Sequence, residues 1–126
     1  KDAVDPITKK NISNKSIPHA PDISANIAID HLVASDLLDG ALYARVGVHH
    51  VDKIYFDDIN SLTQDRYQLI NASLRLETEF GLTMRLYGNN LTDEVYRSYS
   101  YAQPSQGNFS TVGIGRNIGL NLGYKF

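Results

Sequence analysis

Two adjacent histidines, His49 and His50, precede a group of acidic residues and form the most plausible metal-binding group in the sequence. The acidic residues nearest to them are Asp52, Asp57 and Asp58. Imidazole and carboxylate are common metal ligands. This part of the chain alternates in hydrophobicity as a β-strand does, however, and adjacent side chains of a strand point to opposite faces. The two imidazoles are therefore poorly placed to share one ion, and we interpret them as the end of a strand near its polar rim.

No other group of residues forms a catalytic pattern. The glycine-rich run at residues 113–119 would need a strand before it and a helix after it to bind a nucleotide, and a strand-like pattern follows instead. Ser, His and Asp are present, but nothing places a nucleophile beside a base. We therefore predict that the chain is not an enzyme and holds no metal or other cofactor.

The elements that must position these side chains are β-strands, because hydrophobicity alternates with a period of two along most of the chain. The pattern is clearest at the end, where small or polar residues separate the members of an apolar face. That face consists of Ile118, Leu120, Leu122, Tyr124 and Phe126. Similar alternation predicts four earlier strands, at about residues 22–34, 41–50, 66–77 and 82–90.

The connections between the predicted strands alternate between short and long. Short turns occupy residues 35–40 and 78–81, whereas residues 51–64 and 92–110 form long loops. Successive turns of a meander fall on opposite rims, and bacterial outer-membrane barrels have short turns on one rim and long loops on the other. The sequence therefore predicts an all-β fold, an antiparallel up-and-down meander of about five long strands that forms the C-terminal segment of a large transmembrane β-barrel.

Aromatic residues and one arginine fit a strand that crosses a bilayer. The chain has eight Tyr and four Phe, and all except Tyr43 and Tyr87 lie at predicted strand ends or just beyond them, where a bilayer draws aromatic rings to its interfaces. Arg116 lies on the apolar face. At roughly 3.3 Å per residue and a tilt of about 40°, it stands roughly 25 Å from Phe126, at the level of the outer headgroups.

Bulk composition excludes several classes of protein. The net charge of -2 gives no basic face for nucleic acid. The absence of cysteine excludes a disulfide framework, and no run of about 18 apolar residues could form a transmembrane helix. The first 21 residues have no apolar core of a signal peptide and carry three prolines, so we expect a loop within a fragment of a longer, exported protein.

Three segments resemble the C-terminal end of a TonB-dependent outer-membrane receptor. One motif of the chain is similar to the N-L-T/F-D-x-x-Y segment of that family. It consists of Asn89, Asn90, Leu91, Thr92, Asp93 and Tyr96. The paired prolines at residues 17–26 and the strand at residues 67–74 are similar to further parts of that family. The last five residues resemble the ending read by the outer-membrane insertion machinery. Residues 106–110 depart from the G-x-P-R-like entry that the family often has before its last strand.

The resemblance implies a barrel of 22 strands around an N-terminal plug, which imports scarce ligands such as iron-siderophores with energy transmitted by TonB. It implies a Gram-negative outer membrane, with a periplasmic C-terminus and extracellular long loops. Residues 1–21 would be an extracellular loop, and residues 22–126 an incomplete set of barrel strands whose partners are lipid, the rest of the barrel, the plug, TonB and the insertion machinery. Neither plug nor TonB-binding motif is present in these residues.

The resemblance leaves the ligand-contacting residues unknown and puts any ligand contact in the loops at residues 52–65 and 92–110. Charged residues on the polar faces are expected to pair with one another or with a plug. These residues are Arg45, Arg75, Arg85, Glu77 and Asp30. Two alternatives remain open on the sequence, namely another outer-membrane barrel, such as a porin or translocator, and a soluble lipocalin-like barrel.

Overall fold

The computed structural model describes residues 3–6, 9–103 and 105–126, and its regular secondary structure in these ranges is entirely β. The chain divides into two units. Residues 1–24, 50–67 and 95–113 form the first unit, and residues 25–49, 68–94 and 114–126 form the second. The described ranges contain no helix that is long and apolar enough to cross a membrane.

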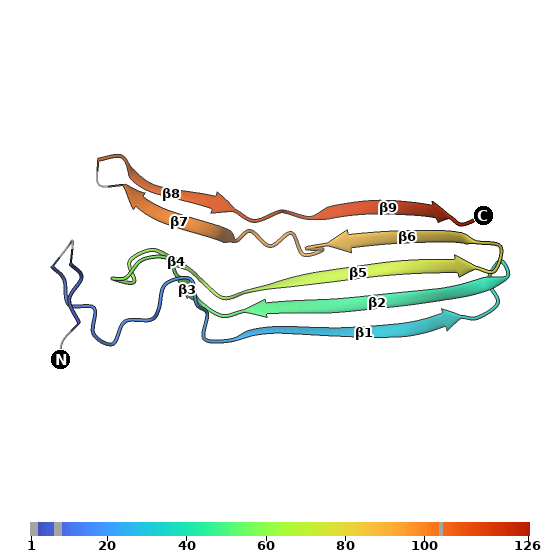
Figure 1. Ribbon diagram of the computed structural model, residues 1–126, viewed down its shortest axis with the longest axis horizontal. Helices are drawn as coiled ribbons and strands as arrows, with labels where there is room; N and C mark the ends of the chain where they lie inside the picture. Colours follow the sequence, from blue (N-terminus) through green and yellow to red (C-terminus); the bar gives the residue numbers. More distant parts are fainter. Residues whose placement is uncertain (1–2, 7–8, 104) are drawn as a thin grey trace. The chain divides into compact units, whose positions relative to one another are not determined.

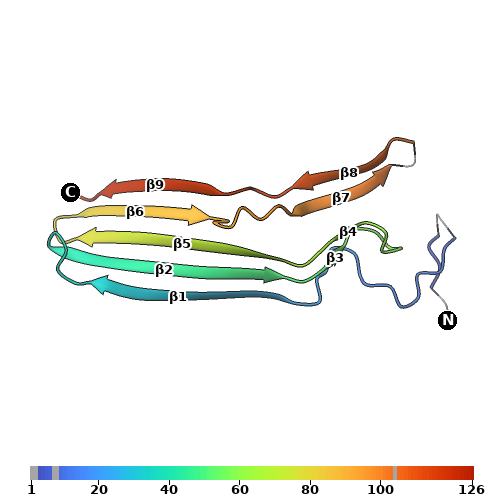
Figure 2. The same cartoon turned by 180° about the vertical axis from the view of Figure 1, so that it is seen from behind.

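The second unit is built on a five-stranded sheet whose strands lie side by side in the order of the sequence, as Figures 1 and 2 show from opposite sides. Its strands are β1 (Ser24–Ala34), β2 (Gly40–Val51), β5 (Tyr67–Thr78), β6 (Leu82–Asn89) and β9 (Asn117–Tyr124). Neighbouring strands run in opposite directions (Figure 1). The predicted all-β meander of about five long strands is confirmed.

The strand register sorts the side chains into the two faces that the alternation predicted. Leu86 of β6 lies opposite Leu74 of β5 on one side and Leu120 of β9 on the other. On the opposite face, Arg85 lies between Arg75 and Asn121 in the same way. Side chains alternate between faces along every strand, so this register makes one face of the sheet apolar and the other polar.

The apolar face of the sheet is exposed. Ile118, Leu120, Leu122 and Tyr124 are 69%, 56%, 65% and 62% exposed. Among the described residues, the buried hydrophobic side chains are Val51, Phe56 and Leu76, and none is completely buried. Soluble monomers rarely expose contiguous apolar surface on this scale, so the sheet needs an apolar environment that these residues do not supply.

Short turns join β1 to β2 and β5 to β6, as predicted. The second turn requires glycine, because Gly81 has a φ of +93° and a Cβ there would lie 2.2 Å from the carbonyl oxygen of Lys125. The Gly81 N–H donates to the Thr78 carbonyl, and the Gly81 carbonyl accepts from the Lys125 N–H. This turn therefore joins β5 to β6 and also fixes the chain just beyond the end of β9.

The long loops predicted at residues 51–64 and 92–110 each contain strands that the sequence analysis did not predict. The first contains β3 (Ile54–Tyr55) and β4 (Thr63–Gln64), and the second contains β7 (Arg97–Gln103) and most of β8 (Gly107–Val112); each pair forms an antiparallel hairpin in the first unit. β8 ends at Val112, and the closing strand β9 begins at Asn117. Cross-strand pairing, including the stacked rings of Tyr101 and Phe109 at 5.4 Å, stabilises the longer hairpin.

The first 21 residues contain one isolated bridge, between Val4 and Asn11, in their described parts. The His19 N–H donates to the Tyr55 carbonyl, which ties this segment to β3 within the first unit. The extracellular position of residues 1–21 stays a prediction.

Candidate functional site

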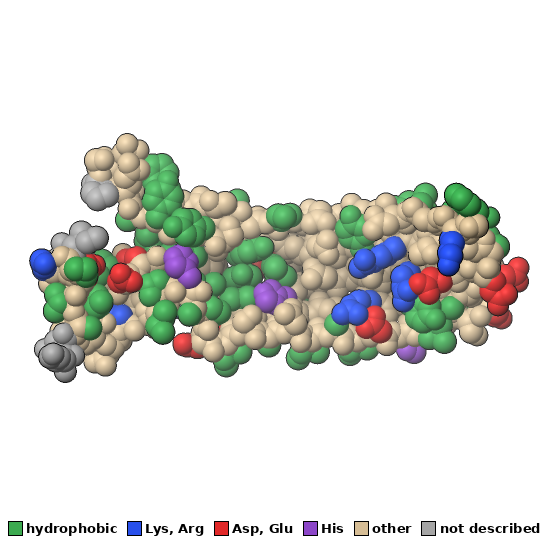
Figure 3. Space-filling model, viewed as in Figure 1, with side chains coloured by type: hydrophobic (Ala, Val, Ile, Leu, Met, Phe, Trp, Pro, Cys, Tyr) green, Lys and Arg blue, Asp and Glu red, His purple; other side chains and the backbone are tan. Residues whose placement is uncertain are grey.

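The polar face of the sheet carries a group of charged side chains (Figure 3). Arg45 donates to Asp30 at 2.7 Å, and Arg75 contacts Glu77. The Arg75 guanidinium also lies 4.7 Å from the centre of the Tyr43 ring. These contacts confirm the expected pairing within the face. Because both ion pairs are about half exposed, each contributes at most about 1 kcal/mol as long as water covers this face.

Arg85 differs from the other two arginines. It stacks on Tyr87, with 5.7 Å between the guanidinium and the ring centre, and it lies directly opposite Arg75 in the sheet. No carboxylate of the described residues forms an ion pair with it. The polar face therefore carries a cation, Arg85, that the ion pairs of the described residues do not neutralise.

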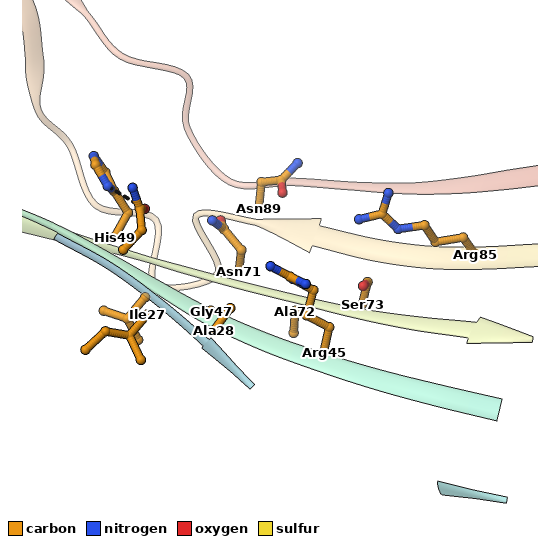
Figure 4. A pocket seen from close by; sticks show the side chains of 12 residues that line it. Ile27, Ala28, Arg45, Gly47, His49, Asn71, Ala72, Ser73, Arg85 and Asn89 are labelled. Carbon is orange, nitrogen blue, oxygen red and sulfur yellow. Dashed lines mark hydrogen bonds between the residues drawn. The ribbon is translucent and has the colours of Figure 1, made fainter. Parts of the chain in front are cut away.

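A hollow of about 320 Å³ lies on this face, with Asn71 and Ser73 of β5 among its lining residues (Figure 4). Arg45 and Arg85 line it from β2 and β6. At its rim His49 Nδ1 lies 2.7 Å from Asn26 Oδ1. The hollow combines cationic and amide groups, so it could accept a polar or anionic surface.

The two histidines do not converge on one ion. His49 contacts Asn26 in the second unit, whereas His50 Nε2 lies 3.6 Å from Asp52 Oδ1 in the first. No group of three or more His, Cys, Asp or Glu side chains in the described ranges could hold a metal.

The motif after β6 is built around Asn90, which is only 3% exposed. Its backbone has a φ of 49°, a left-handed conformation that asparagine tolerates better than most residues. The Asn90 side chain accepts from the Glu94 N–H and donates to the carbonyls of Glu94 and Ile114. The Asn90 N–H in turn donates to Asn71 Oδ1 of β5. The backbone of Asn90 thus joins the end of β6 to β5, and its buried side chain joins the same point to the entry of β9.

The other motif residues extend this connection. Asp93 Oδ1 accepts the backbone N–H of Arg116, and the Leu91 N–H donates to the Ile70 carbonyl. Asn89 donates to Asn117 Oδ1 across β6 and β9. Thr92 is exposed and lies between Leu91 and Asp93 in the tight turn. Within the second unit, therefore, the motif residues from Asn89 to Asp93 contact backbone and side chains of the same chain.

Tyr96 belongs to the first unit, where its ring stacks on Tyr67 with 4.4 Å between ring centres. The ring also covers Gly113, where an added Cβ would lie 2.0 Å from the Tyr96 ring. The Gly113 N–H donates to the Tyr96 carbonyl. Gly113 is thus a position at which the backbone must approach an aromatic face closely.

We expect the substitution Gly113→Ala to destabilise the protein by about 1–3 kcal/mol, because the new methyl group would displace the stacked Tyr96 ring. In a Tyr96→Ala background the same substitution should cost less than about 0.5 kcal/mol. A double-mutant cycle on the unfolding of the full-length protein measures this difference. Gly47→Ala is the matched control, since its Cβ would lie at an ordinary 3.5 Å from Ala28. Equal costs in the two backgrounds would contradict the assigned contact.

Sequence reasoning missed an aromatic cluster in the first unit. The His19 and Tyr99 rings are stacked at 5.4 Å, and Phe56 meets both at 5.6 and 6.5 Å. Tyr99 also contacts Tyr101. The alternation of Tyr99 and Tyr101 was the available signal, because it indicates one face of a short strand. The cluster draws on both segments that were expected to hold any ligand contact.

Known proteins resemble this chain over most of its length. No family model matches it. The pesticin receptor of Yersinia pestis is 31% identical over 110 residues, which are 87% of this chain and 16% of that receptor, and a pesticin receptor of Yersinia enterocolitica is 30% identical over the same share. The crystal structure of the ferric yersiniabactin uptake receptor FyuA from Yersinia pestis matches with a TM-score of 0.78 and 31% identity, over 86% of this chain and 17% of that one. The chain thus spans about one sixth of the length of the proteins that it matches.

Proposed function

We propose that this chain is part of a protein that imports a ferric siderophore across the outer membrane. The chain is the C-terminal part of the barrel of a TonB-dependent outer-membrane receptor. The observation that supports this proposal most is the agreement between an exposed apolar sheet face and a structural match, at a TM-score of 0.78, to a ferric siderophore uptake receptor. The similar proteins are receptors and transporters, which argues against an enzyme.

The sheet has two free edges, at β1 and β9, in the described part of the chain. A bilayer does not tolerate unpaired strand edges, because their backbone groups would lack hydrogen-bond partners. Strands outside this chain must therefore pair with both edges and close the barrel. The polar face would then line the lumen of the barrel and contact the plug. Energy transmitted by TonB would displace that plug.

The proposed orientation follows from the turns and the final strand. The two short turns face the periplasm, and the hairpins β3–β4 and β7–β8 belong to the extracellular loops with residues 1–21. The last strand would be recognised by the insertion machinery through its outward residues, which are Ile118, Leu120, Leu122, Tyr124 and Phe126. Their high exposure supports this assignment, because a recognised strand must present its side chains before the barrel closes.

The motif residues Asn89, Asn90, Leu91 and Asp93 would have a structural role, because their hydrogen bonds are to this chain. Thr92 would complete the turn between Leu91 and Asp93. Tyr96 would hold the start of the extracellular segment through its stacking on Tyr67. We place ligand contact instead in the segments at residues 52–65 and 92–110, which meet through the contact between the Phe56 and Tyr99 rings.

Growth under iron limitation tests the proposed function. The full-length gene, expressed in a strain without ferric-siderophore receptors, should restore growth and uptake of labelled iron when ferric yersiniabactin is supplied. Uptake should disappear when TonB is deleted, because the plug then stays in place. A strain carrying the empty vector is the control.

Uptake that persists without TonB would instead indicate a passive porin. Failure of a correctly assembled receptor to take up any ferric siderophore would contradict the transport proposal. Release of the full-length protein into buffer without detergent would favour the lipocalin-like alternative, which the similar proteins do not favour.

A further inference from the structure

The apolar face of the sheet is not smooth, because small residues on three neighbouring strands leave a groove of about 290 Å³. Its floor is formed by Ala44 of β2, Ala72 of β5 and Gly88 of β6. Ala72 and Gly88 lie directly opposite each other in the sheet. The groove therefore exists because each of these three positions carries at most a methyl group.

Larger apolar side chains border this groove. They are Val46, Leu74, Leu86, Leu91 and Ile118. Leu91 leans over Gly88 so closely that a Cβ there would lie 2.5 Å from Leu91 Cδ2. The volume is at the lower end of the range of about 300–1,000 Å³ for small-molecule sites, which fits part of one acyl chain better than a whole lipid.

A cation lies close in the chain to Ile118, one of the lining residues of the groove. Arg116 is exposed and lies two residues before Ile118, which limits their separation along the chain to about 7 Å. The Arg116 N–H is held by Asp93 Oδ1 at 2.9 Å, so the carboxylate binds the backbone. No ion pair in the described ranges involves the Arg116 guanidinium. It is therefore free to meet an anion.

We propose that this groove and Arg116 together form a binding site for an anionic lipid of the outer leaflet, with one acyl chain in the groove and its phosphate on the Arg116 guanidinium. The site rests on the outer-membrane placement within the proposed function and does not depend on the ligand transported. The depth of the groove agrees with the position of the positive charge. The groove extends from mid-strand toward the end of the sheet, where Arg116 reaches the level of the lipid headgroups. A cation there gains a phosphate partner, whereas a neutral lipid would use the groove alone.

Native mass spectrometry of the full-length receptor in detergent tests the site with two probes, diphosphorylated lipid A and a diacylglycerol, which has acyl chains but no phosphate. We expect lipid A to bind more tightly than the diacylglycerol. Arg116→Gln should weaken lipid A binding about tenfold by removing a charged hydrogen bond to phosphate. Ala72→Leu should weaken it by a similar factor, because the larger side chain fills the groove.

Two substitutions outside the site are the matched controls. Lys125→Gln removes a cation near the other end of β9, and Val33→Leu adds a methylene group to an exposed residue of β1 outside the groove. Both should leave the lipid A affinity within twofold of the unsubstituted receptor. Equal affinity for the two lipids would overturn the site, and so would an Arg116→Gln or Ala72→Leu variant that binds lipid A as the controls do.

The iron-uptake measurement separates this inference from the proposed function. A receptor that takes up ferric siderophore but shows no preference for lipid A contradicts the lipid site alone. One that binds lipid A through Arg116 and the groove, but does not transport, contradicts the transport proposal alone.

Discussion

Replacing Leu120 with arginine is expected to destabilise the receptor by about 2–4 kcal/mol, which is the cost of a cation near the midplane of a bilayer on a lipid-facing position. Leu120 lies in the middle of β9, opposite Leu86, and is 56% exposed on the apolar face. Reversible denaturant unfolding of the full-length receptor in lipid vesicles measures the change in the free energy of unfolding.

The matched control is an arginine on the other face of the same sheet. Thr83 is exposed and lies opposite Glu77, so Thr83→Arg places the cation beside a carboxylate on the polar face. This variant should change the free energy of unfolding by less than about 1 kcal/mol. Equal costs for the two variants would mean that the faces do not differ in environment, and would contradict the assignment of the apolar face to lipid.

Replacing Asn90 with alanine is expected to cost about 3 kcal/mol. The substitution leaves the Glu94 N–H and the Ile114 carbonyl without their side-chain partner, at about 1–3 kcal/mol for buried groups. It also puts alanine at a φ of 49°, which adds about 1–2 kcal/mol. Unfolding of the full-length receptor in vesicles again measures the effect.

Two further variants show which property of Asn90 is responsible. Asn90→Asp keeps the acceptor for the Glu94 N–H and should recover part of the loss. Asn89→Ala removes one exposed hydrogen bond to Asn117 and should cost less than about 1 kcal/mol. A loss at Asn90 no larger than that at Asn89 would show that the buried contacts do not hold the strand ends together.

The long strands could be predicted from the sequence because a strand with one face in lipid and one in a polar lumen must alternate. Leu74, Leu86 and Leu120 fall on one face by this rule alone, and the register confirms it. The hairpin of β3 and β4 was missed because strands of two residues show no period, and the alternation of Tyr99 and Tyr101 in β7 was not recognised as a strand. Pairs such as Tyr101 with Phe109 depend on a cross-strand contact that has no period in the sequence.

Features that depend on strand register or on the close approach of distant residues could not be predicted from the sequence either. Nothing in the sequence places Arg75 opposite Arg85, since that requires knowing which residues of β5 and β6 pair. The motif was found by resemblance, but its geometry was not, because the hydrogen bonds of Asn90 reach Asn71 and Ile114 far along the chain. The groove beside Arg116 could be found only once Ala44, Ala72 and Gly88 were placed side by side.

Spin-label accessibility along β9 tests most directly whether one face of this sheet meets hydrocarbon. The chain contains no cysteine, so single cysteines introduced at residues 117–124 can each carry one label in the full-length receptor in vesicles, once any cysteine outside this chain is replaced by serine. We expect high accessibility to oxygen and low accessibility to a water-soluble nickel complex at residues 118, 120, 122 and 124, with the reverse at the residues between them. Accessibility without this period of two, or with the nickel complex reaching residues 120 and 122 best, would contradict this expectation.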